Sequence, residues 1–360
     1  MNTVIVTFGE IMTRLSAPGN NRLRQSLPGS LDAAFAGAES NIAAAIALLG
    51  GRSRFVTALP RNVLGDACTG FLAGFGVDTS AILRTDTGRM PQYFIETGVA
   101  QRGGTVLYDR DYSSFSLTPG DAYDWDAAFS GASVLVISGI SPALSANAAA
   151  ATLHAAKAAR ARGLTVCCDL NFRAKLWNWE PGTPARALAR RVMGQLMPHI
   201  DIVLTNPDQS FDVLDIPWDR ARAADPAAVD ASARAIARAH PHLRQVVFTM
   251  RDSHSASHND LGALLYEPAL DRITRAPSPD GHYTPLVTQP IVDRLGAGDA
   301  FAGGYLFALH TPELAEPATA LSFGIAASCL AHSIPGDINF VSRAEVETLM
   351  RGDASGRVSR

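Results

Sequence analysis

Short apolar strands alternate with helical segments through most of the 360-residue sequence, and this rhythm constrains the fold more than any other feature. Ser133–Gly139 (SVLVISG) is a β-branched apolar run, Ser145 can cap the Ala-rich helix that follows, and LTVCCDLN forms the next strand after Gly163. Near-continuous apolar strands are typical of parallel sheets that are covered on both faces. Because such crossovers are right-handed, the simplest assembly is a three-layer α/β/α domain with a doubly wound, mostly parallel sheet.

The same alternation appears nearer both ends of the sequence. The predicted strands are Val4–Phe8, Arg54–Leu59, Asp201–Thr205 and Gln245–Met250, and the predicted helices are Ala38–Leu49 and Ala228–Ala239. A chain of this length can bury a large core, and we expect these elements to belong to one α/β body.

Two stretches break the rhythm. Thr13–Phe35 is polar, contains Pro and Gly and has no helical period. Pro91–Thr97 and Thr105–Arg110 alternate like two antiparallel strands, joined through Gln101-Arg102-Gly103-Gly104. They predict a small β lid that projects from the α/β body, although a decorated edge of the main sheet is the alternative. We therefore expect a core of residues 1–12, 36–88 and 113–350, a lid of residues 13–35 and 89–112, and a disordered tail at 351–360.

Charge and composition exclude several classes of function. The net charge of −3 comes from interspersed acidic and basic residues, which leaves no basic footprint for nucleic acid. No run approaches the roughly 18 apolar residues of a membrane span, and the first residues lack a basic signal-peptide region. Cys68, Cys167, Cys168 and Cys329 have no zinc-type spacing, and the Cys167-Cys168 pair fits a buried strand. We expect a cytoplasmic protein with no nucleic-acid and no membrane partner.

Two histidines in a Ser/Asn-rich segment also suggest metal binding at first sight. His254 and His258 stand four residues apart in a loop rich in Ser and Asn, where side chains are usually solvated. We interpret both as solvated loop residues and predict no metal ligand among the protein side chains.

The segment Ile291–Tyr305 (IVDRLGAGDAFAGGY) carries the strongest chemical signal. We predict a strand that leads into Gly296-Ala297-Gly298-Asp299, where an apolar helix begins. Small residues at a helix start let backbone N–H groups surround an anion, and the helix dipole favours negative charge there. Asp299 at this turn could accept a proton from a substrate hydroxyl while the amides stabilise a phosphoryl group. An Asp helix cap with tightly packed glycines is the structural alternative.

The motif DRLGAGDAFAGG resembles the C-terminal signature D-T-x-G-A-G-D-x-F of the ribokinase-like (phosphofructokinase B, PfkB) carbohydrate kinase family, with Arg294 in place of Thr. Ala36–Asn41 and the Ala-rich helix after it resemble the N-terminal signature G-G-A-x-x-N-x-A-x-x-L-A-x-L-G, and Gly65-Asp66 resembles the element that follows it. The resemblance extends from about Thr7 to about Asp337, nearly the whole chain.

The resemblance implies a kinase that uses ATP and Mg²⁺ to phosphorylate a small-molecule sugar. By its motifs, Asp299 is the catalytic base, Gly296, Ala297 and Gly298 form the anion hole, and Gly37 and Asn41 contact the sugar. Such a kinase can also form a homo-oligomer through the lid. We expect the Mg²⁺ to be held mainly by nucleotide phosphates and water, because the sequence shows no carboxylate cage.

Two family elements are altered on the nucleotide side. The family's N-x-x-E reads Asn206-Pro207-Asp208-Gln209, so Asn206 matches and Gln209 does not. The family's T-x-G-x-x-G begins with Thr249 and continues through Arg251 into DSHSASHND. The resemblance assigns Asn206, Thr249 and Arg251 to nucleotide binding.

Within the family, the sequence is most similar to 2-keto-3-deoxygluconate kinases. The supporting stretches are RFVTALPRNVLGDA, YFIETGVAQRGGTVLYDRDYSS, SGISPALS and DLNFRAKLW. An acid sugar requires a cation in its site, and Arg binds a carboxylate through charge-assisted hydrogen bonds. The residues that match the substrate-binding positions of those kinases are Tyr93, Tyr108, Arg110, Arg173 and Asp337.

Three functional hypotheses remain. The first is a kinase of an acid sugar, 2-keto-3-deoxygluconate. The second is a fructokinase or another neutral-sugar kinase of the same family. The third is a catalytically silent sugar-binding homologue, which the altered nucleotide elements suggest and the intact Asp299 turn opposes. A dinucleotide-binding dehydrogenase fits poorly, because no G-x-G-x-x-G follows the first strand.

Overall fold

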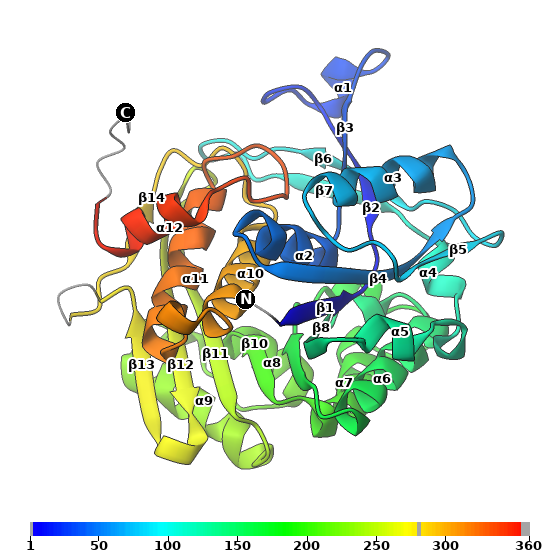
Figure 1. Cartoon of the computed structure of the whole chain (residues 1–360). Helices are drawn as coiled ribbons and strands as arrows, with labels where there is room; N and C mark the ends of the chain where they lie inside the picture. The colour runs from blue at the N-terminus through cyan, green and yellow to red at the C-terminus, as the bar shows by residue number, and fades with distance from the viewer. Residues whose placement is uncertain (1–2, 279–281, 354–360) are drawn as a thin grey trace.

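The central sheet follows the order β13-β12-β11-β10-β9-β8-β1-β4-β5, with β14 paired to β12. The structure of the protein is a computed structural model, and it describes residues 3–278 and 282–353 (Figure 1). The strands are β1 (Val4–Phe8), β4 (Arg52–Pro60), β5 (Ile82–Thr85), β8 (Ala132–Ser138), β9 (Thr165–Asp169), β10 (Ile202–Thr205), β11 (Gln245–Ser255), β12 (His258–Glu267), β13 (Arg272–Ala276) and β14 (Leu286–Thr288). Pairing is parallel from β5 to β11 and antiparallel for β12, β13 and β14.

Helices cover both faces of this sheet (Figure 1). One face packs against α2 (Ala38–Leu48), α3 (Val63–Gly74), α10 (Ala297–Leu309), α11 (Pro317–Ala331) and α12 (Arg343–Met350). The other packs against α5 (Trp125–Phe129), α6 (Ala146–Ala161), α7 (Ala185–Leu196), α8 (Pro207–Leu214) and α9 (Pro226–Ala239). Burial on both faces explains why the parallel strands are continuously apolar. The predicted α/β/α class is confirmed.

Local signals in the sequence explain how the predicted βαβ unit forms. Ser145 accepts a hydrogen bond from Ala148 N at 3.0 Å and so caps the start of α6. Gly163 follows the end of α6 with a φ of +76°, a conformation in which a side chain is strained. Cys167 and Cys168 are both buried in β9, as the sequence predicts for this pair.

A second, four-stranded sheet has the order β3-β2-β6-β7 and lies beside the main sheet as a separate unit. Its strands are β2 (Met12–Ser16), β3 (Asp32–Ala36), β6 (Gln92–Glu96) and β7 (Thr105–Asp109), with the short helix α1 (Leu23–Ser26) between β2 and β3. We call this sheet the lid sheet. β6 and β7 pair antiparallel, as predicted, and Tyr93 lies directly opposite Tyr108. The lid sheet is not an extension of the main sheet edge, so that alternative is wrong.

Two sequence-based predictions of secondary structure fail. No strand leads into Gly296, because β14 ends at Thr288 and residues 289–295 form a loop with a cis Gln289–Pro290 bond. The polar segment after Met250 is not a loop, because β11 continues to Ser255 and pairs with β12. The sequence did not predict this hairpin because its outer part faces solvent and therefore has polar side chains instead of an apolar strand pattern.

No helix within residues 3–278 and 282–353 is long and apolar enough to cross a bilayer. Part of the tail that the sequence predicts to be disordered, residues 354–360, lies outside the described residues.

Candidate active site

A cavity of about 1000 Å³ opens at the carboxyl ends of the parallel strands, between the start of α10 and the lid sheet. This edge is where ligands bind in doubly wound α/β folds. The cavity is lined by every site residue named from the sequence: Gly37, Asn41, Tyr93, Tyr108, Arg110, Arg173, Asn206, Thr249, Arg251, Gly296, Ala297, Gly298, Asp299 and Asp337. The fold therefore brings together positions that are up to 300 residues apart in the sequence.

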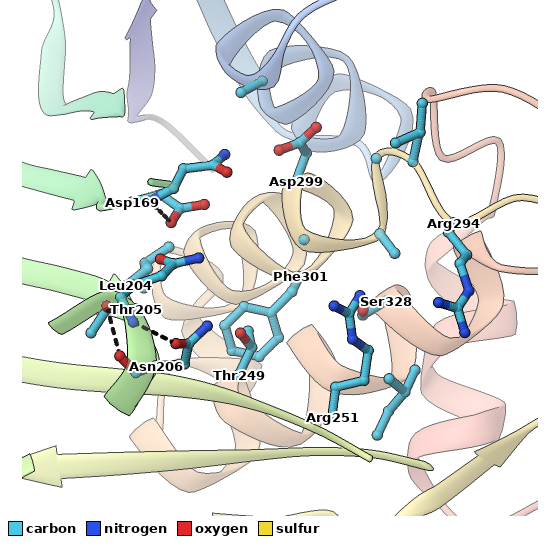
Figure 2. A pocket seen from close by; sticks show the side chains of 18 of the residues that line it. Asp169, Leu204, Thr205, Asn206, Thr249, Arg251, Arg294, Asp299, Phe301 and Ser328 are labelled. Atoms are coloured by element: carbon cyan, nitrogen blue, oxygen red, sulfur yellow. Dashed lines mark hydrogen bonds between the residues drawn. The ribbon is translucent and has the colours of Figure 1, made fainter. Parts of the chain in front are cut away.

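Asp299 projects into the cavity from the first turn of α10 (Figure 2). Its Oδ2 accepts a hydrogen bond of 2.7 Å from Nδ2 of Asn41 on α2. Burial raises the pKa of Asp299, and the hydrogen bond from Asn41 lowers it. Burial has the larger effect, and the pKa is about 8. The nearby carboxylates of Asp169, Asp337 and Glu39 raise the pKa further. A carboxylate with a pKa near neutrality can take up a proton during a reaction, as a general base requires.

The Gly296-Ala297-Gly298 turn presents backbone amides to the cavity. Gly296 has a φ of +77°, and a Cβ there would lie 2.0 Å from the backbone oxygen of Asp337. Only glycine fits that position, and the close contact fixes the turn against the loop that carries Asp337. No atom lies within 4 Å of a Cβ built on Gly298, so a ligand can approach its backbone. Because the first amides of a helix have no intrahelical acceptor, this turn suits a phosphoryl group.

Asp337 is held from the lid sheet by two side chains. Its Oδ1 accepts a hydrogen bond of 2.9 Å from the Tyr93 hydroxyl and another from Arg14 Nη1. Arg14, which lies on β2 and is 4% exposed, also binds Asp293. Asp293 in turn accepts from the backbone N of Arg294 at 2.7 Å and caps the loop before the anion hole. This buried network joins the lid sheet, the Asp337 loop and the anion-hole loop.

Sequence reasoning missed Arg14 and Glu10. Arg14 lies in the stretch that showed only polar character, although its strand reads MTRLS with alternating burial. Glu10 follows β1 and accepts hydrogen bonds from Arg110 Nε and Nη2 at 2.9 and 2.6 Å. Arg110 also lies 5.2 Å from the ring centre of Tyr108. Its charge is therefore already compensated by Glu10, a partner that the resemblance did not indicate.

Arg173 differs from Arg110 because it is exposed and unpaired. It follows β9 and donates to the backbone oxygen of Phe172 at 3.1 Å. Among the described residues, no carboxylate lies within salt-bridge distance of Arg173. Asp169 lies near it, and burial raises the pKa of Asp169 to about 6 although the Arg173 charge lowers it. Arg173 is therefore a cation in the cavity wall that is available to an anionic ligand.

The nucleotide elements line the same cavity, and Figure 2 shows Asn206, Thr249 and Arg251 near the helix that carries Asp299 and Phe301. Asn206 Oδ1 caps α8 by accepting from Gln209 N at 2.9 Å. Gln209 Oε1 is buried and has no hydrogen-bond partner. Asp208 Oδ1 accepts hydrogen bonds from Trp218 Nε1 at 3.1 Å and from Arg220 Nε at 2.9 Å.

Arg294, which replaces the family's Thr, is held by the β11–β12 hairpin. It donates from Nε to Ala256 O at 3.0 Å and from Nη2 to Asn259 Oδ1 at 2.6 Å. Arg251 on β11 is exposed and lies within salt-bridge distance of none of the described carboxylates. Arg251 therefore remains available for an anion such as a nucleotide phosphate.

Similarity to known proteins covers the whole chain. The profile of the pfkB family carbohydrate kinases matches residues 2–343, so the chain belongs to this family. A 2-dehydro-3-deoxygalactonokinase from Haloferax volcanii is 32% identical over 356 residues, which cover 99% of this chain and 99% of that protein. A 2-dehydro-3-deoxygluconokinase from Bacillus subtilis is 32% identical over 172 residues, or 48% of this chain and 52% of that protein.

Solved structures give the same result. The crystal structure of 2-dehydro-3-deoxygluconokinase from Thermotoga maritima has a TM-score of 0.86 and 35% identity, with 97% of this chain and 98% of that chain covered. A fructokinase from Xylella fastidiosa with bound ATP has a TM-score of 0.73 at 22% identity, with 98% and 100% covered, and shares the fold. The predicted family, its fold and the resemblance to 2-keto-3-deoxygluconate kinases are thereby confirmed.

Proposed function

We propose that this protein transfers the γ-phosphoryl group of ATP to a hydroxyl of an acid sugar, 2-keto-3-deoxygluconate or a close epimer. The observation that carries the proposal is the placement of Asp299, the free anion-hole amides and an unpaired Arg173 in one cavity. Relatives named as kinases of 2-dehydro-3-deoxygluconate and 2-dehydro-3-deoxygalactonate support this class of substrate.

The residues divide the chemistry between them. Asp299 accepts the proton of the substrate hydroxyl, whose oxygen forms a new bond to the γ-phosphorus as the bond to the β-phosphate oxygen breaks. The products are the sugar phosphate and ADP, and the proton passes from Asp299 to solvent. The amides of Ala297 and Gly298 stabilise the charge on the transferred phosphoryl oxygens. Asn41 keeps the Asp299 carboxylate oriented toward the hydroxyl.

The acid end of the sugar meets Arg173. A carboxylate in this part of the cavity would form a charge-assisted hydrogen bond with the unpaired guanidinium. Arg110 donates to Glu10 through one N–H on Nε and one on Nη2, so its charge is already paired and three of its five N–H donors remain for a ligand. Tyr93 and Asp337 hold one another through their 2.9 Å hydrogen bond and position hydroxyl-binding groups beside Gly37. Arg173 is therefore the main determinant of specificity for acid sugars.

The residues present fit a Mg²⁺ ion that enters with the nucleotide. Mg²⁺ prefers oxygen ligands and keeps several waters. Gln209 lines the cavity, and its Oε1 is buried without a hydrogen-bond partner among the described residues, so a small side-chain rotation would let it accept a hydrogen bond from metal-bound water. Bound there, Mg²⁺ would reduce the negative charge that the sugar hydroxyl approaches. Turnover should then stop in excess chelator.

The remaining proposals concern location and assembly. We place the reaction in the cytoplasm, because ATP is consumed and all four cysteines are free thiols, as reducing compartments favour. A homo-oligomer through the lid sheet is consistent with Leu107 on the edge strand β7, which is 61% exposed. Sedimentation of the wild type and a Leu107→Glu variant tests that interface.

A coupled ATP-consumption assay over a panel of sugars tests the function. The panel contains 2-keto-3-deoxygluconate, its galacto epimer, aldonic acids and neutral ketoses such as fructose. We expect the highest kcat/KM for a 2-keto-3-deoxy acid. Preferential turnover of a neutral ketose would instead favour the fructokinase hypothesis, and no turnover of any sugar would favour the silent homologue.

A further inference from the structure

Three side chains on the β11–β12 hairpin converge outside the catalytic centre. His254 on β11 and His258 and Asp260 on β12 form what we call the His–Asp cluster. The ligand atoms of the three residues lie within 4.8 Å of one another. His254 Nε2 lies 2.8 Å from Asp260 Oδ2, and His258 Nε2 lies 3.5 Å from Asp260 Oδ1. The hairpin thus brings the carboxylate of Asp260 to the two imidazoles that the sequence predicts to be solvated loop residues.

One oxygen of the cluster, Asp260 Oδ1, has no close hydrogen-bond donor among the described residues. Asp260 Oδ1 is shielded from solvent and makes no hydrogen bond with any described residue. The Asp260 side chain is 28% exposed as a whole, but a shielded carboxylate oxygen without a close donor leaves room for a cation or a water. The His258 ring nitrogen is too far away, at 3.5 Å, for a normal hydrogen bond to this oxygen.

From this geometry we propose that the His–Asp cluster binds one divalent transition-metal ion of the Zn²⁺ or Ni²⁺ type through both imidazoles and the Asp260 carboxylate. Imidazole nitrogen favours Zn²⁺, Ni²⁺ and Cu²⁺ over Mg²⁺, which prefers oxygen. Ligand atoms around a tetrahedral zinc ion are separated by about 3.4 Å, given bonds of about 2.0–2.1 Å. The cluster needs only small side-chain rotations to reach that spacing, and both imidazoles are partly exposed to solvent. Three protein ligands leave a further coordination position open for water.

The position of the cluster connects it to the rest of the site. The hairpin turn at Ala256 and Ser257 bonds to the lid loop through Ala256 N to Ala100 O at 2.8 Å and Ala100 N to Ser257 Oγ at 2.9 Å. The same turn accepts hydrogen bonds from Arg294, next to the anion-hole loop. Asp260 itself also lines the cavity. Metal binding would therefore cross-link the two strands that support both the lid loop and Arg294.

Titration of the metal-free full-length protein with ZnCl₂ and NiCl₂ in a calorimeter tests the proposal without reference to kinase activity. We expect one ion per chain, bound in the presence of excess Mg²⁺. His258→Ala removes one ligand and Asp260→Asn weakens another. Loss of a group that only hydrogen-bonds to a metal ligand already costs about 10–100-fold in metal affinity, so loss of a ligand should cost each variant at least that much. Co²⁺ should give a visible absorption band in the wild type that both variants lack.

The chain offers a matched control in His242→Ala. His240 and His242 are also neighbouring histidines, with ring centres 6.2 Å apart, but they belong to no three-ligand group among the described residues. This variant should bind the ion as the wild type does. Equal affinities in the wild type and His258→Ala, or no stoichiometric binding to the wild type, would overturn the proposal. Circular dichroism checks that each variant is folded. If Asp260→Asn does not fold, His258→Ala still tests the proposal, because the His258 side chain is partly exposed.

Discussion

The two halves of the cavity differ in how their side chains are fixed. On the sugar side, Asp299, Asp337 and Arg110 each have a buried partner from another element, namely Asn41, Arg14 and Glu10. On the nucleotide side, Arg251 is exposed and Gln209 Oε1 has no partner. On the sugar side, these three groups are held by buried partners and Arg173 is the exception. On the nucleotide side, Asn206 and Asp208 have partners, whereas Arg251 and Gln209 present groups that no described residue binds.

This difference matches the demands of the two substrates. A sugar is recognised by hydrogen bonds to hydroxyls of fixed geometry, which requires donors and acceptors that are already oriented. A nucleotide phosphate carries its own charge, and cations and helix amides can bind it without a rigid frame. We therefore expect substitutions on the sugar side to cost more than those on the nucleotide side.

The largest expected effect comes from Asp299→Asn. The amide cannot accept the hydroxyl proton, so turnover should fall by about 10²–10⁴, the range for a positioned general base. Folding and sugar binding should remain, because Asn is isosteric and still accepts from Asn41. Steady-state kinetics and a thermal melt provide the measurement.

Asp66→Asn is the matched control for this substitution. Asp66 lies on α3, is exposed and pairs with Arg84 at 2.7 Å. Exposed ion pairs contribute about 0–1 kcal/mol, so activity and stability should stay close to the wild type. A loss for Asp299→Asn of less than about tenfold, below the range for such a base, would argue against its catalytic role.

Arg173→Ala should have the next largest effect on kinetics. It removes the guanidinium of the sugar side that forms no salt bridge with any described carboxylate. Loss of a charge-assisted hydrogen bond to a buried partner charge costs about 2–5 kcal/mol. We expect the low end, since Arg173 is exposed and water can enter, which corresponds to an increase in KM for 2-keto-3-deoxygluconate of about 30-fold. The KM for a neutral sugar should hardly change. Equal changes for both sugars would mean that Arg173 supports the fold or the nucleotide.

Arg110→Ala tests whether Arg110 and Arg173 have different roles. Removal of Arg110 leaves the buried Glu10 carboxylate with the Ser113 hydroxyl but without a cation, and breaking a buried ion pair costs about 3–5 kcal/mol of stability. A marked drop in melting temperature is therefore expected, whereas Arg173→Ala should melt like the wild type. The resemblance alone assigned both arginines to the substrate, and only the Glu10 contact distinguishes them.

Most of the fold was predictable because its signals are local. The apolar strands, the Ser145 cap and the alternating residues of β6 and β7 each require only a few neighbouring residues. The β11–β12 hairpin was not predictable in this way, because its outer strand pairs are polar and their stability depends on pairing. The loop before Gly296 was misread as a strand because it contains the apolar residues Ile291 and Val292, although no strand pairs with it among the described residues.

The site residues also differ in whether a local sequence pattern specifies them. Asp299 and the glycines were found because a motif of adjacent residues specifies them. The partners Arg14 and Glu10 were missed because each lies in an uninformative segment and acquires its role only through contacts with residues about 100 to 320 positions away. No local pattern encodes such a contact, and the charge of Arg14 gave the only available signal.

A fourth, smaller effect concerns the pH dependence of catalysis. The base must be ionised, and the pKa of Asp299 is about 8, so the acid limb of kcat/KM should rise through about that pH. The negative charge of Asp169 contributes to raising this pKa. Asp169→Asn removes that charge, so the limb should move to lower pH by less than about one unit, or roughly 1.4 kcal/mol.

Asp208→Asn is the control for the pH profile. Asp208 also lines the cavity, but its carboxylate pairs with Arg220 on the nucleotide side. Its substitution should leave the acid limb in place. A shift of equal size in both variants would indicate a general field effect rather than a specific coupling of Asp169 to the base.

The smallest effect should come from Gln209, and it tests whether the nucleotide side tolerates change. Gln209→Ala removes one acceptor that the protein itself does not use. A bridging-water hydrogen bond contributes about 1 kcal/mol, so the KM for Mg-ATP should rise by no more than about fivefold, with the KM for the sugar unchanged. Gln209→Glu restores the acidic residue of the family motif and should lower the Mg²⁺ concentration needed for half-maximal activity. A loss as large as that of Arg173→Ala would mean that the two halves of the cavity are equally constrained.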